Sequence, residues 1–250
     1  MIKAVIIDDE RNSRDIISLM LEKYCPHITI ADTASDCAEG IAKIIEHRPG
    51  LVFLDLEMPD GTGFDVLMGT QPEVAFEAVF VTAFEKKFLH VIRCSEVELI
   101  LKPIDKESLL QAVDLISARI AANSSKHRYE VLLENFNNVK HASWKLLIPT
   151  SEEEAHTILL PAVEYLEAHM ENCMFCLSSG ASVQAERPFR YYADLFSSLR
   201  FYQINNMQMV QLSNISHIEP GGGKIVLKSG RMLDITERRK KDLLSRMQHE

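Results

Sequence analysis

Long apolar runs are missing from this sequence, and cysteine is scarce. No stretch of about 18 consecutive apolar residues is present, so a membrane-spanning helix is not expected. The opening MIKAVIIDDE turns acidic at Asp8 and lacks the small-residue cleavage pattern of a secretory signal, so we expect a cytoplasmic protein with no membrane partner. The five cysteines are odd in number and irregularly spaced, which favours reduced thiols over a disulfide framework.

Cys173 and Cys176 have the spacing of a metal-binding or redox pair. A structural zinc site needs about four ligands, and no second Cys/His pair lies nearby in the sequence. Redox pairs are activated at helix N-termini, whereas ENCMFCLSS is typical of a strand. We interpret both residues as ordinary, partly buried cysteines.

Charge is distributed unevenly along the 250 residues. Residues 1–126 carry 13 Lys/Arg against 21 Asp/Glu, and residues 127–186 carry 3 against 9. Residues 187–250 carry 11 against 6 and form the only basic region. Such asymmetry is a hint of nucleic-acid contact by the last quarter of the chain.

The first 122 residues alternate short apolar runs with amphipathic stretches. IKAVIID, ITIADT, LVFLDL, EAVFVTA and ELILKP are almost wholly apolar, as expected of strands buried on both faces. Helical patterns separate them. The sequence therefore predicts an α/β domain over residues 1–122, with a doubly wound, five-stranded parallel sheet covered by helices.

The rest of the chain has a different pattern. Residues 123–144 mix Ser, Asn and charge with one apolar helical patch, and we interpret them as a partly helical linker. Residues 145–250 are mostly β, with a tight hairpin predicted at the glycines 221–223. Thr236 is the predicted N-cap of a final helix.

Three carboxylates stand at predicted strand ends in the first domain. Asp8 and Asp9 end the first strand, and Asp55 ends the third. The carboxyl ends of central parallel strands share one edge of the sheet, so these side chains are expected to converge. Clustered carboxylates repel one another unless a cation joins them, and oxygen-only ligands favour Mg²⁺.

Two more strand ends supply groups suited to phosphate chemistry. Thr82 offers a hydroxyl, and Lys102 offers a cation that can neutralise a phosphoryl group. A cis bond before Pro103 would aim the lysine into the pocket. Asp55 is then the candidate nucleophile, forming an acyl phosphate with metal help. The alternative is that these residues only solubilise the surface.

The stretches IIDDE, LVFLDLEMPDGTGF, VFVTAF and LKPID resemble the receiver domain of two-component response regulators. The resemblance implies phosphorylation of Asp55 by a histidine kinase. It also implies Mg²⁺ held by Asp9, Asp55 and the backbone of Glu57, with Asp8 acting through water. Leu99 stands where many receivers carry an aromatic switch residue.

Residues 145–247 resemble the LytTR DNA-binding domain, through LLIPTSEE, VEYLEA, RFYQINNMQMVQLSNISHIEP, KIVLKSGRMLDI and TERRKKDLL. Where relatives place basic residues, this chain has Gln203, Asn205 and Asn206, and Gln211 replaces an asparagine. Amides can read adenine edges, so the substitutions indicate either altered or lost base reading. The apolar residues of this run are expected to be buried: Phe201, Ile204, Met209, Val210 and Leu212.

Cations near the last helix would attract DNA phosphates. Arg238, Arg239 and Lys240 are the candidate contacts, and His169 lies in a loop where LytTR domains approach DNA. The alternative is a solvated helix face, and for His169 a surface residue.

These features predict a response regulator that is not an enzyme. Its expected partners are a cognate histidine kinase and double-stranded promoter DNA, with a homodimer forming on phosphorylation. Two alternatives remain. The chain could switch protein partners through a C-terminal domain that has lost DNA binding. A Mg²⁺-dependent phosphohydrolase fits the carboxylates, but the second domain does not suggest the substrate cap it would need.

Overall fold

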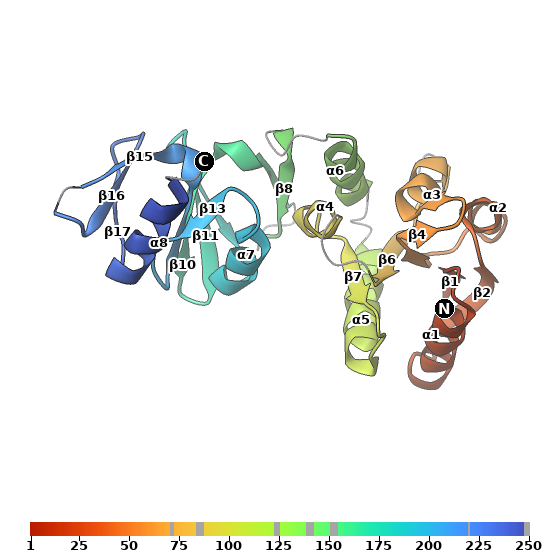
Figure 1. The fold of residues 1–250 in the computed structure, drawn as a ribbon. Coiled ribbons are helices and arrows are strands. Elements are labelled where there is room, and N and C mark those ends of the chain that lie inside the picture. The colour runs from red at the N-terminus through yellow and green to blue at the C-terminus, as the bar shows by residue number, and fades with distance from the viewer. Residues whose placement is uncertain are drawn as a thin grey trace. The chain divides into compact units, whose positions relative to one another are not determined.

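The fold is described from a computed structural model covering residues 1–70, 73–83, 88–122, 126–138, 143–150, 155–219 and 221–247. The chain forms two compact units, Met1–Val139 and Lys140–Glu250, which we call the first unit and the second unit. Figure 1 shows the elements of each.

A parallel sheet forms the centre of the first unit. It has five parallel strands, as predicted, and their order is β2-β1-β3-β6-β7. The strands are β1 (Ile2–Ile7), β2 (Ile28–Ala34), β3 (Leu51–Asp55), β6 (Glu77–Thr82) and β7 (Glu98–Leu101). The accompanying helices are α1 (Arg11–Tyr24), α2 (Cys37–His47), α3 (Gly63–Thr70), α4 (Leu89–Cys94) and α5 (Lys106–Ala122). Two short strands, β4 (Glu57–Met58) and β5 (Gly61–Thr62), pair after β3.

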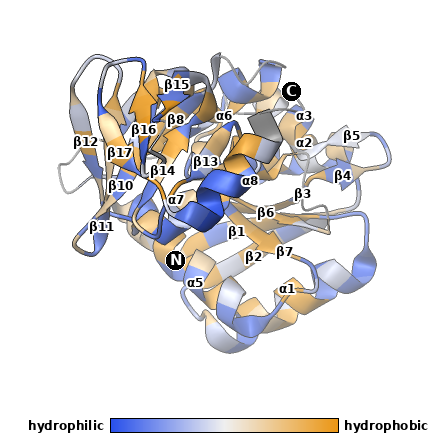
Figure 2. Ribbon diagram, turned by 60° about the vertical axis from the view of Figure 1, so that its left-hand side comes forward, coloured by the Kyte–Doolittle hydropathy of each residue, from blue (hydrophilic) through white to orange (hydrophobic). Residues whose placement is uncertain are grey.

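The central strands are apolar because helices cover both faces. β3 and β6 are buried at every residue, and the central strands of this sheet are hydrophobic in Figure 2. A core of side chains from β1, β3, β6, α1 and α5 fills one face. The strand ends are therefore held rigidly, which fixes the polar residues that follow them.

The helix α6 (Lys126–Asn137) lies within the predicted linker, residues 123–144. It packs against α4 and is part of the first unit. Val131 and Leu132 are fully buried, so the apolar patch of α6 is shielded from solvent. The sequence shows the patch but not the surface that it covers.

A five-stranded antiparallel sheet, ordered β12-β11-β10-β14-β13, organises the second unit. Its strands are β10 (Val163–His169), β11 (Asn172–Leu177), β12 (Ser182–Ala185), β13 (Phe201–Gln203) and β14 (Gln208–Gln211). The hairpin β8 (Lys145–Ile148) and β9 (His156–Leu159) precedes it, with a 3₁₀ turn η2 (Leu160–Ala162). A second 3₁₀ turn, η3 (Leu212–Asn214), leads to a three-stranded sheet of β15 (Ile215–Ile218), β16 (Lys224–Leu227) and β17 (Met232–Asp234).

Helices α7 (Phe189–Phe196) and α8 (Glu237–Met247) complete the second unit. α7 packs on β10 and β11, with Tyr192 and Phe196 in edge contact with Phe175. A separate core joins Tyr165 and Val210 of the large sheet to the three-stranded sheet and to Leu243 of α8. This region is mostly β, as predicted.

Several local predictions are confirmed. All five cysteines are free, and Cys173 and Cys176 both lie within β11. Of the run 201–212, the expected core residues are buried except Leu212, which is half-buried against the core. Gly222 adopts a left-handed φ of 86° in the turn between β15 and β16. Within the described part of the chain, no helix has the length and apolarity needed to cross a membrane.

Candidate functional site

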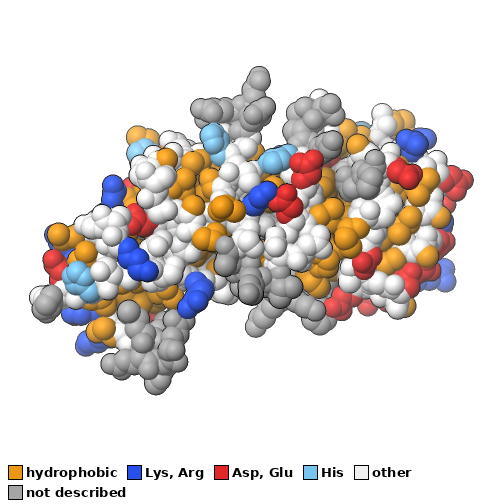
Figure 3. Space-filling model, turned by 90° about the horizontal axis from the view of Figure 1, so that it is seen from above, with side chains coloured by type: hydrophobic (Ala, Val, Ile, Leu, Met, Phe, Trp, Pro, Cys, Tyr) orange, Lys and Arg blue, Asp and Glu red, His pale blue; other side chains and the backbone are white. Residues whose placement is uncertain are grey.

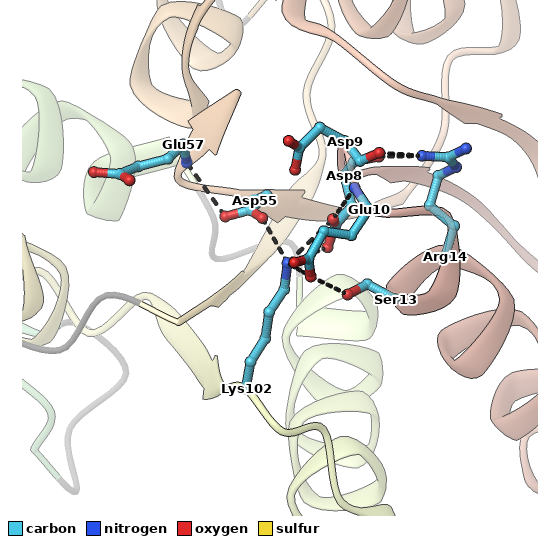
Figure 4. A network of polar contacts seen from close by, with 8 residues as sticks. All are labelled: Asp8, Asp9, Glu10, Ser13, Arg14, Asp55, Glu57 and Lys102. Carbon is cyan, nitrogen blue, oxygen red and sulfur yellow. Dashed lines mark hydrogen bonds and ion pairs between the residues drawn. The ribbon is translucent and has the colours of Figure 1, made fainter. Parts of the chain in front are cut away.

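Five predicted site residues meet at the carboxyl edge of the parallel sheet. Asp8 and Asp9 follow β1, Asp55 ends β3, Thr82 ends β6 and Lys102 follows β7. Figure 4 shows the carboxylates of Asp8, Glu10 and Asp55 around the Lys102 ammonium. Asp8, Asp55 and Thr82 are buried, while Asp9 is exposed. The site is therefore a partly buried acidic pocket that opens to solvent on the Asp9 side.

Lys102 is the hub of this pocket. Its Nζ lies 2.7 Å from Asp55 Oδ2, 3.0 Å from Asp8 Oδ2 and 2.9 Å from Glu10 Oε2. Burial by itself lowers the pKa of Lys102, but hydrogen bonds to Asp55, Glu10 and Asp8 outweigh it and raise the pKa. The lysine is thus a fixed ammonium beside Asp55.

The carboxyl group of Asp8 is under the opposite pressure. Burial raises its pKa, the Lys102 hydrogen bond lowers it, and the nearby Asp55 charge raises it, with a net upward shift. Asp8 Oδ1 accepts a hydrogen bond from the Glu10 N–H at 2.9 Å. The positive charge of Lys102 alone therefore does not fully neutralise the carboxylates of the pocket.

The donor set fits a small divalent cation. One carboxylate oxygen from each of Asp8, Asp9 and Asp55 lies within 4.8 Å of the other two. Asp8 Oδ2 is buried and, although it is close to Lys102 Nζ, accepts no well-aligned hydrogen bond. The Glu57 N–H donates to Asp55 Oδ1 at 3.2 Å, so its backbone lies beside the cluster. Hard oxygen donors in this arrangement suit Mg²⁺.

Three residues that the sequence analysis did not single out shape the pocket. Glu10 Oε2 accepts a hydrogen bond from the Lys102 ammonium, which also contacts Asp8 and Asp55, and another from Ser13 Oγ at 3.0 Å. Arg14 Nη1 donates to the carbonyls of Asp8 and Asp9 at 2.5 and 3.1 Å, which fixes the backbone turn after β1. A Cβ at Gly63 would lie 2.5 Å from the Asp55 carbonyl oxygen, so only glycine fits there. Of these three residues, Gly63 is the one that the sequence could have indicated, because it closely follows the acidic stretch that contains Asp55.

Two further residues, Pro103 and Leu99, lie close to Lys102 in the sequence. The Lys102–Pro103 peptide bond is cis. Leu99 is half-buried in β7, so no aromatic side chain occupies this position beside the pocket.

The basic region of the sequence lies largely on α8 and the preceding hairpin. α8 is strongly hydrophilic in Figure 2, and Asp and Glu side chains gather over the first unit in Figure 3. Arg238 is exposed, whereas Arg239 and Lys240 are half-buried. The Lys240 ammonium lies against Gly222, since a Cβ built at that glycine would meet it. Arg238 is therefore the most accessible of the three predicted cations.

The amide side chains of the 201–212 run make contacts within the second unit. Arg239 Nη2 donates to Gln203 Oε1 at 3.2 Å. Asn205 Nδ2 donates to Gln208 Oε1 and to the Asp234 carbonyl, and Asn205 Oδ1 accepts from the Met207 N–H. Gln203 and Asn205 thus serve the internal structure, a role that the sequence does not reveal.

Asn206 and His169 lie at the surface. Asn206 is exposed in the turn between β13 and β14, and His169 is exposed at the end of β10. The N-terminal half of α8 is anchored by Tyr202, whose hydroxyl lies 2.8 Å from both the Arg239 carbonyl and Asp242 Oδ2. Residues of β13 therefore position the basic helix.

Known proteins resemble this chain in part or over its full length. The family model for the response regulator receiver domain matches residues 4–114. An uncharacterized response regulatory protein of Vibrio cholerae serotype O1 is 34% identical over 134 residues, a match that spans 54% of each chain. The transcriptional regulatory protein BtsR of Escherichia coli (strain K12) is 25% identical over 244 residues, covering 97% of this chain and 98% of BtsR.

Among solved structures, the signal receiver domain of the putative response regulator NarL from Mycobacterium tuberculosis is 20% identical. It covers 47% of this chain and 98% of that one, with a TM-score of 0.42. The family match spans the strands and helices that build the acidic pocket. Residues 4–114 thus match the model of the response regulator receiver domain, in a chain that is similar along nearly its whole length to a transcriptional regulatory protein.

Proposed function

We propose that a histidine kinase phosphorylates this protein on Asp55, and that the second unit then controls transcription by binding promoter DNA. The observation that carries the first part is the Asp55 carboxylate, which lies 2.7 Å from a permanently charged Lys102 and beside Asp8 and Asp9. A carboxylate held next to a cation and a metal-binding cluster is arranged to accept a phosphoryl group.

The residues have separable roles in this transfer. Asp55 attacks the phosphorus atom and becomes an acyl phosphate while the donor leaves with its bonding electrons. Lys102 neutralises charge on the transferred group, and the Thr82 hydroxyl donates to one of its oxygens. Asp8, Asp9, Asp55 and the Glu57 backbone would hold Mg²⁺, which supplies further charge neutralisation when bound.

Incubation with acetyl phosphate and Mg²⁺ tests the phosphoacceptor. We expect one phosphoryl group per chain by intact mass, lost in Asp55→Asn and on chelation of Mg²⁺. Asp105→Asn is the matched control, because Asp105 caps α5 by accepting from Ser108 and lies outside the pocket. Uptake by Asp55→Asn equal to that of the wild type would refute the assignment.

DNA binding by the second unit is proposed from the LytTR resemblance and from α8. Arg238 is exposed, and Arg239 and Lys240 lie on the same helix, which β13 holds in place. Exposed cations on a fixed helix can neutralise phosphates and release counterions. Dimerisation after phosphorylation would place two such helices on one DNA molecule.

Binding to promoter fragments at several salt concentrations tests this second part. We expect affinity to fall steeply with salt, with a slope of about −0.9 per phosphate contact. Arg238→Ala with Arg239→Ala should weaken binding and flatten that slope by about 2. The control pair is Arg190→Ala with Arg200→Ala, which removes equal charge from other elements of the second unit.

One observation favours a second candidate, a regulator that switches protein partners. Gln203 and Asn205 hold internal contacts, and α8 begins with an acidic residue, Glu237, so few groups remain to read bases. This candidate predicts the same phosphoryl uptake but no salt-dependent binding to any promoter fragment. A genome-wide binding experiment distinguishes the two.

A further inference from the structure

The helix α6 is the last element of the first unit before the chain enters the second. It ends at Asn137, and the second unit begins at Lys140. Tyr129, Val131 and Leu132 of α6 are buried, and Tyr129 contacts Glu77 of the first unit. The position of this helix therefore fixes the point at which the chain leaves the receiver domain.

A buried polar anchor holds the N-terminal part of α6. The Tyr129 hydroxyl donates to Glu77 Oε2 at 3.1 Å and accepts a hydrogen bond from the Ala78 N–H. Both Tyr129 and Glu77 are 2% exposed, and Arg128 Nη1 lies 4.0 Å from the other carboxylate oxygen. A buried hydroxyl bonded to a buried carboxylate is costly to separate, so this end of α6 is firmly attached.

Aromatic packing holds the C-terminal end of α6. Phe136 stacks on Phe64 of α3, with ring centroids 4.0 Å apart and planes 11° from parallel. Phe88, the residue before α4, completes the set with centroids 5.2 Å from Phe64 and 5.8 Å from Phe136. We call these three residues the aromatic triad.

The aromatic triad is continuous with the backbone of the phosphoacceptor pocket. Phe64 directly follows Gly63, the glycine pressed against the Asp55 carbonyl. Phe64 also packs on Phe80, with centroids 5.4 Å apart, two residues before Thr82 on β6. A shift of the strand ends around Asp55 would therefore displace Phe64 and its stacked partner, because close-packed rings have few alternative arrangements.

We propose that α6 carries the phosphorylation signal out of the receiver domain, with the aromatic triad acting where Leu99 leaves no switch aromatic. This inference rests on the proposed phosphorylation of Asp55. In the unphosphorylated protein the triad and the Tyr129 anchor dock α6. Rearrangement of the pocket around a phosphoryl group separates the rings and loosens α6, which frees the connection to the second unit.

The inference has a reciprocal consequence. If the conformation with α6 loosened is the one that accepts the phosphoryl group, weakening the docking of α6 raises the population of that conformation before transfer, and with it the rate of uptake. An aromatic pair contributes about 0.5–1.5 kcal/mol beyond its buried area, so Phe136→Leu should raise the rate of phosphoryl uptake by about two- to tenfold. Tyr129→Phe, at the other end of the helix, should act in the same direction.

Full-length protein with acetyl phosphate and Mg²⁺ provides the test. Uptake is followed by intact mass, and exchange of the α6 amides is followed by hydrogen–deuterium mass spectrometry. The expected result is faster α6 exchange on phosphorylation, absent in Asp55→Asn, and faster uptake in Phe136→Leu and Tyr129→Phe. The control is Tyr24→Leu, which removes a ring that stacks under Lys106 at the end of α1. Its uptake rate should equal that of the wild type.

Two results would overturn the inference while leaving the proposed function standing. One is wild-type protein that takes up a phosphoryl group with no acceleration of α6 exchange. The other is uptake in both α6 variants at the wild-type rate. Absence of phosphoryl uptake in the wild type would instead overturn the proposed function, and the inference with it.

Discussion

Asp8→Asn is expected to make the first unit more stable when no divalent cation is present. Asp8 is 1% exposed, and its carboxylate lies within 4.8 Å of those of Asp9 and Asp55. At that distance and an effective dielectric constant of about 20, each neighbour opposes its charge by about 3.5 kcal/mol. Lys102, at 3.0 Å, favours the charge by about 5.5 kcal/mol on the same basis.

The balance is roughly 1.5 kcal/mol against the Asp8 charge, before any desolvation. Asparagine removes the charge but keeps an oxygen to accept from the Glu10 N–H. The variant should therefore gain about 1–2 kcal/mol in free energy of unfolding at neutral pH. Mg²⁺ should reverse the order, because a cation that binds only the folded wild type stabilises it more than the variant.

Hydrogen exchange of the β3 amides is a suitable assay, because β3 is buried at every residue and lies in the first unit. The only tryptophan, Trp144, lies in the second unit and reports on that unit instead. A variant less stable than the wild type without Mg²⁺, with equal Mg²⁺ protection of both, would refute the electrostatic reasoning.

The pH dependence supplies an independent check. The pKa of Asp8 is raised in the folded protein, mainly by burial, so folding favours its protonated form. As the pH falls through that raised pKa, Asp8 of the wild type becomes protonated, and the unfavourable charge that lowers its stability is removed. The stability advantage of Asp8→Asn should therefore shrink in acid. Asp105→Asn should instead lower the stability at neutral pH, because hydrogen bonds from Ser108 lower the pKa of Asp105 and so favour its charged form in the folded protein. This loss of stability should shrink as the pH falls.

Three further predictions concern single contacts. Lys102→Ala should lower the stability of the first unit by about 1–3 kcal/mol without Mg²⁺, measured by β3 exchange; an unchanged value would contradict its role as hub. Gly222→Ala forces a left-handed φ and meets Lys240, so it should cost roughly 1–2 kcal/mol by Trp144 fluorescence in urea. Gly223→Ala, which meets no atom within 4 Å, should cost less than Gly222→Ala, and equal losses would count against this explanation. Tyr202→Phe should speed exchange of the α8 amides, and unchanged exchange would show that α8 is held elsewhere.

Periodicity and residue type predict the first unit well. Nearly continuous apolar strands that alternate with helical patterns favour a parallel sheet covered on both faces, and such a sheet brings the residues at the ends of β1, β3, β6 and β7 to one edge. The convergence of Asp8, Asp55 and Lys102 follows from that topology. The set of residues in the pocket could therefore be predicted from the sequence. The burial of Asp8 and Asp55 and the ion pair between Glu10 and Lys102 could not.

Contacts between residues far apart in the chain could not be predicted from the sequence. Tyr129 meets Glu77 across 52 positions, and Arg239 meets Gln203 across 36. No local pattern specifies such pairs, because they depend on how whole elements pack. For this reason the linker patch gave no hint of its docking surface, and the amides of 201–212 suggested base reading while the structure shows Gln203 and Asn205 engaged internally.

The attachment of α6 to the first unit determines where the chain can be truncated without exposing buried groups of that unit. A fragment ending at residue 122 would lack the hydroxyl that pairs with the buried Glu77 and would uncover Phe64, inviting aggregation. A fragment ending at 138 retains both. A fragment cut directly after α5 would thus be destabilised, and phosphorylation kinetics measured on it would not describe the intact molecule.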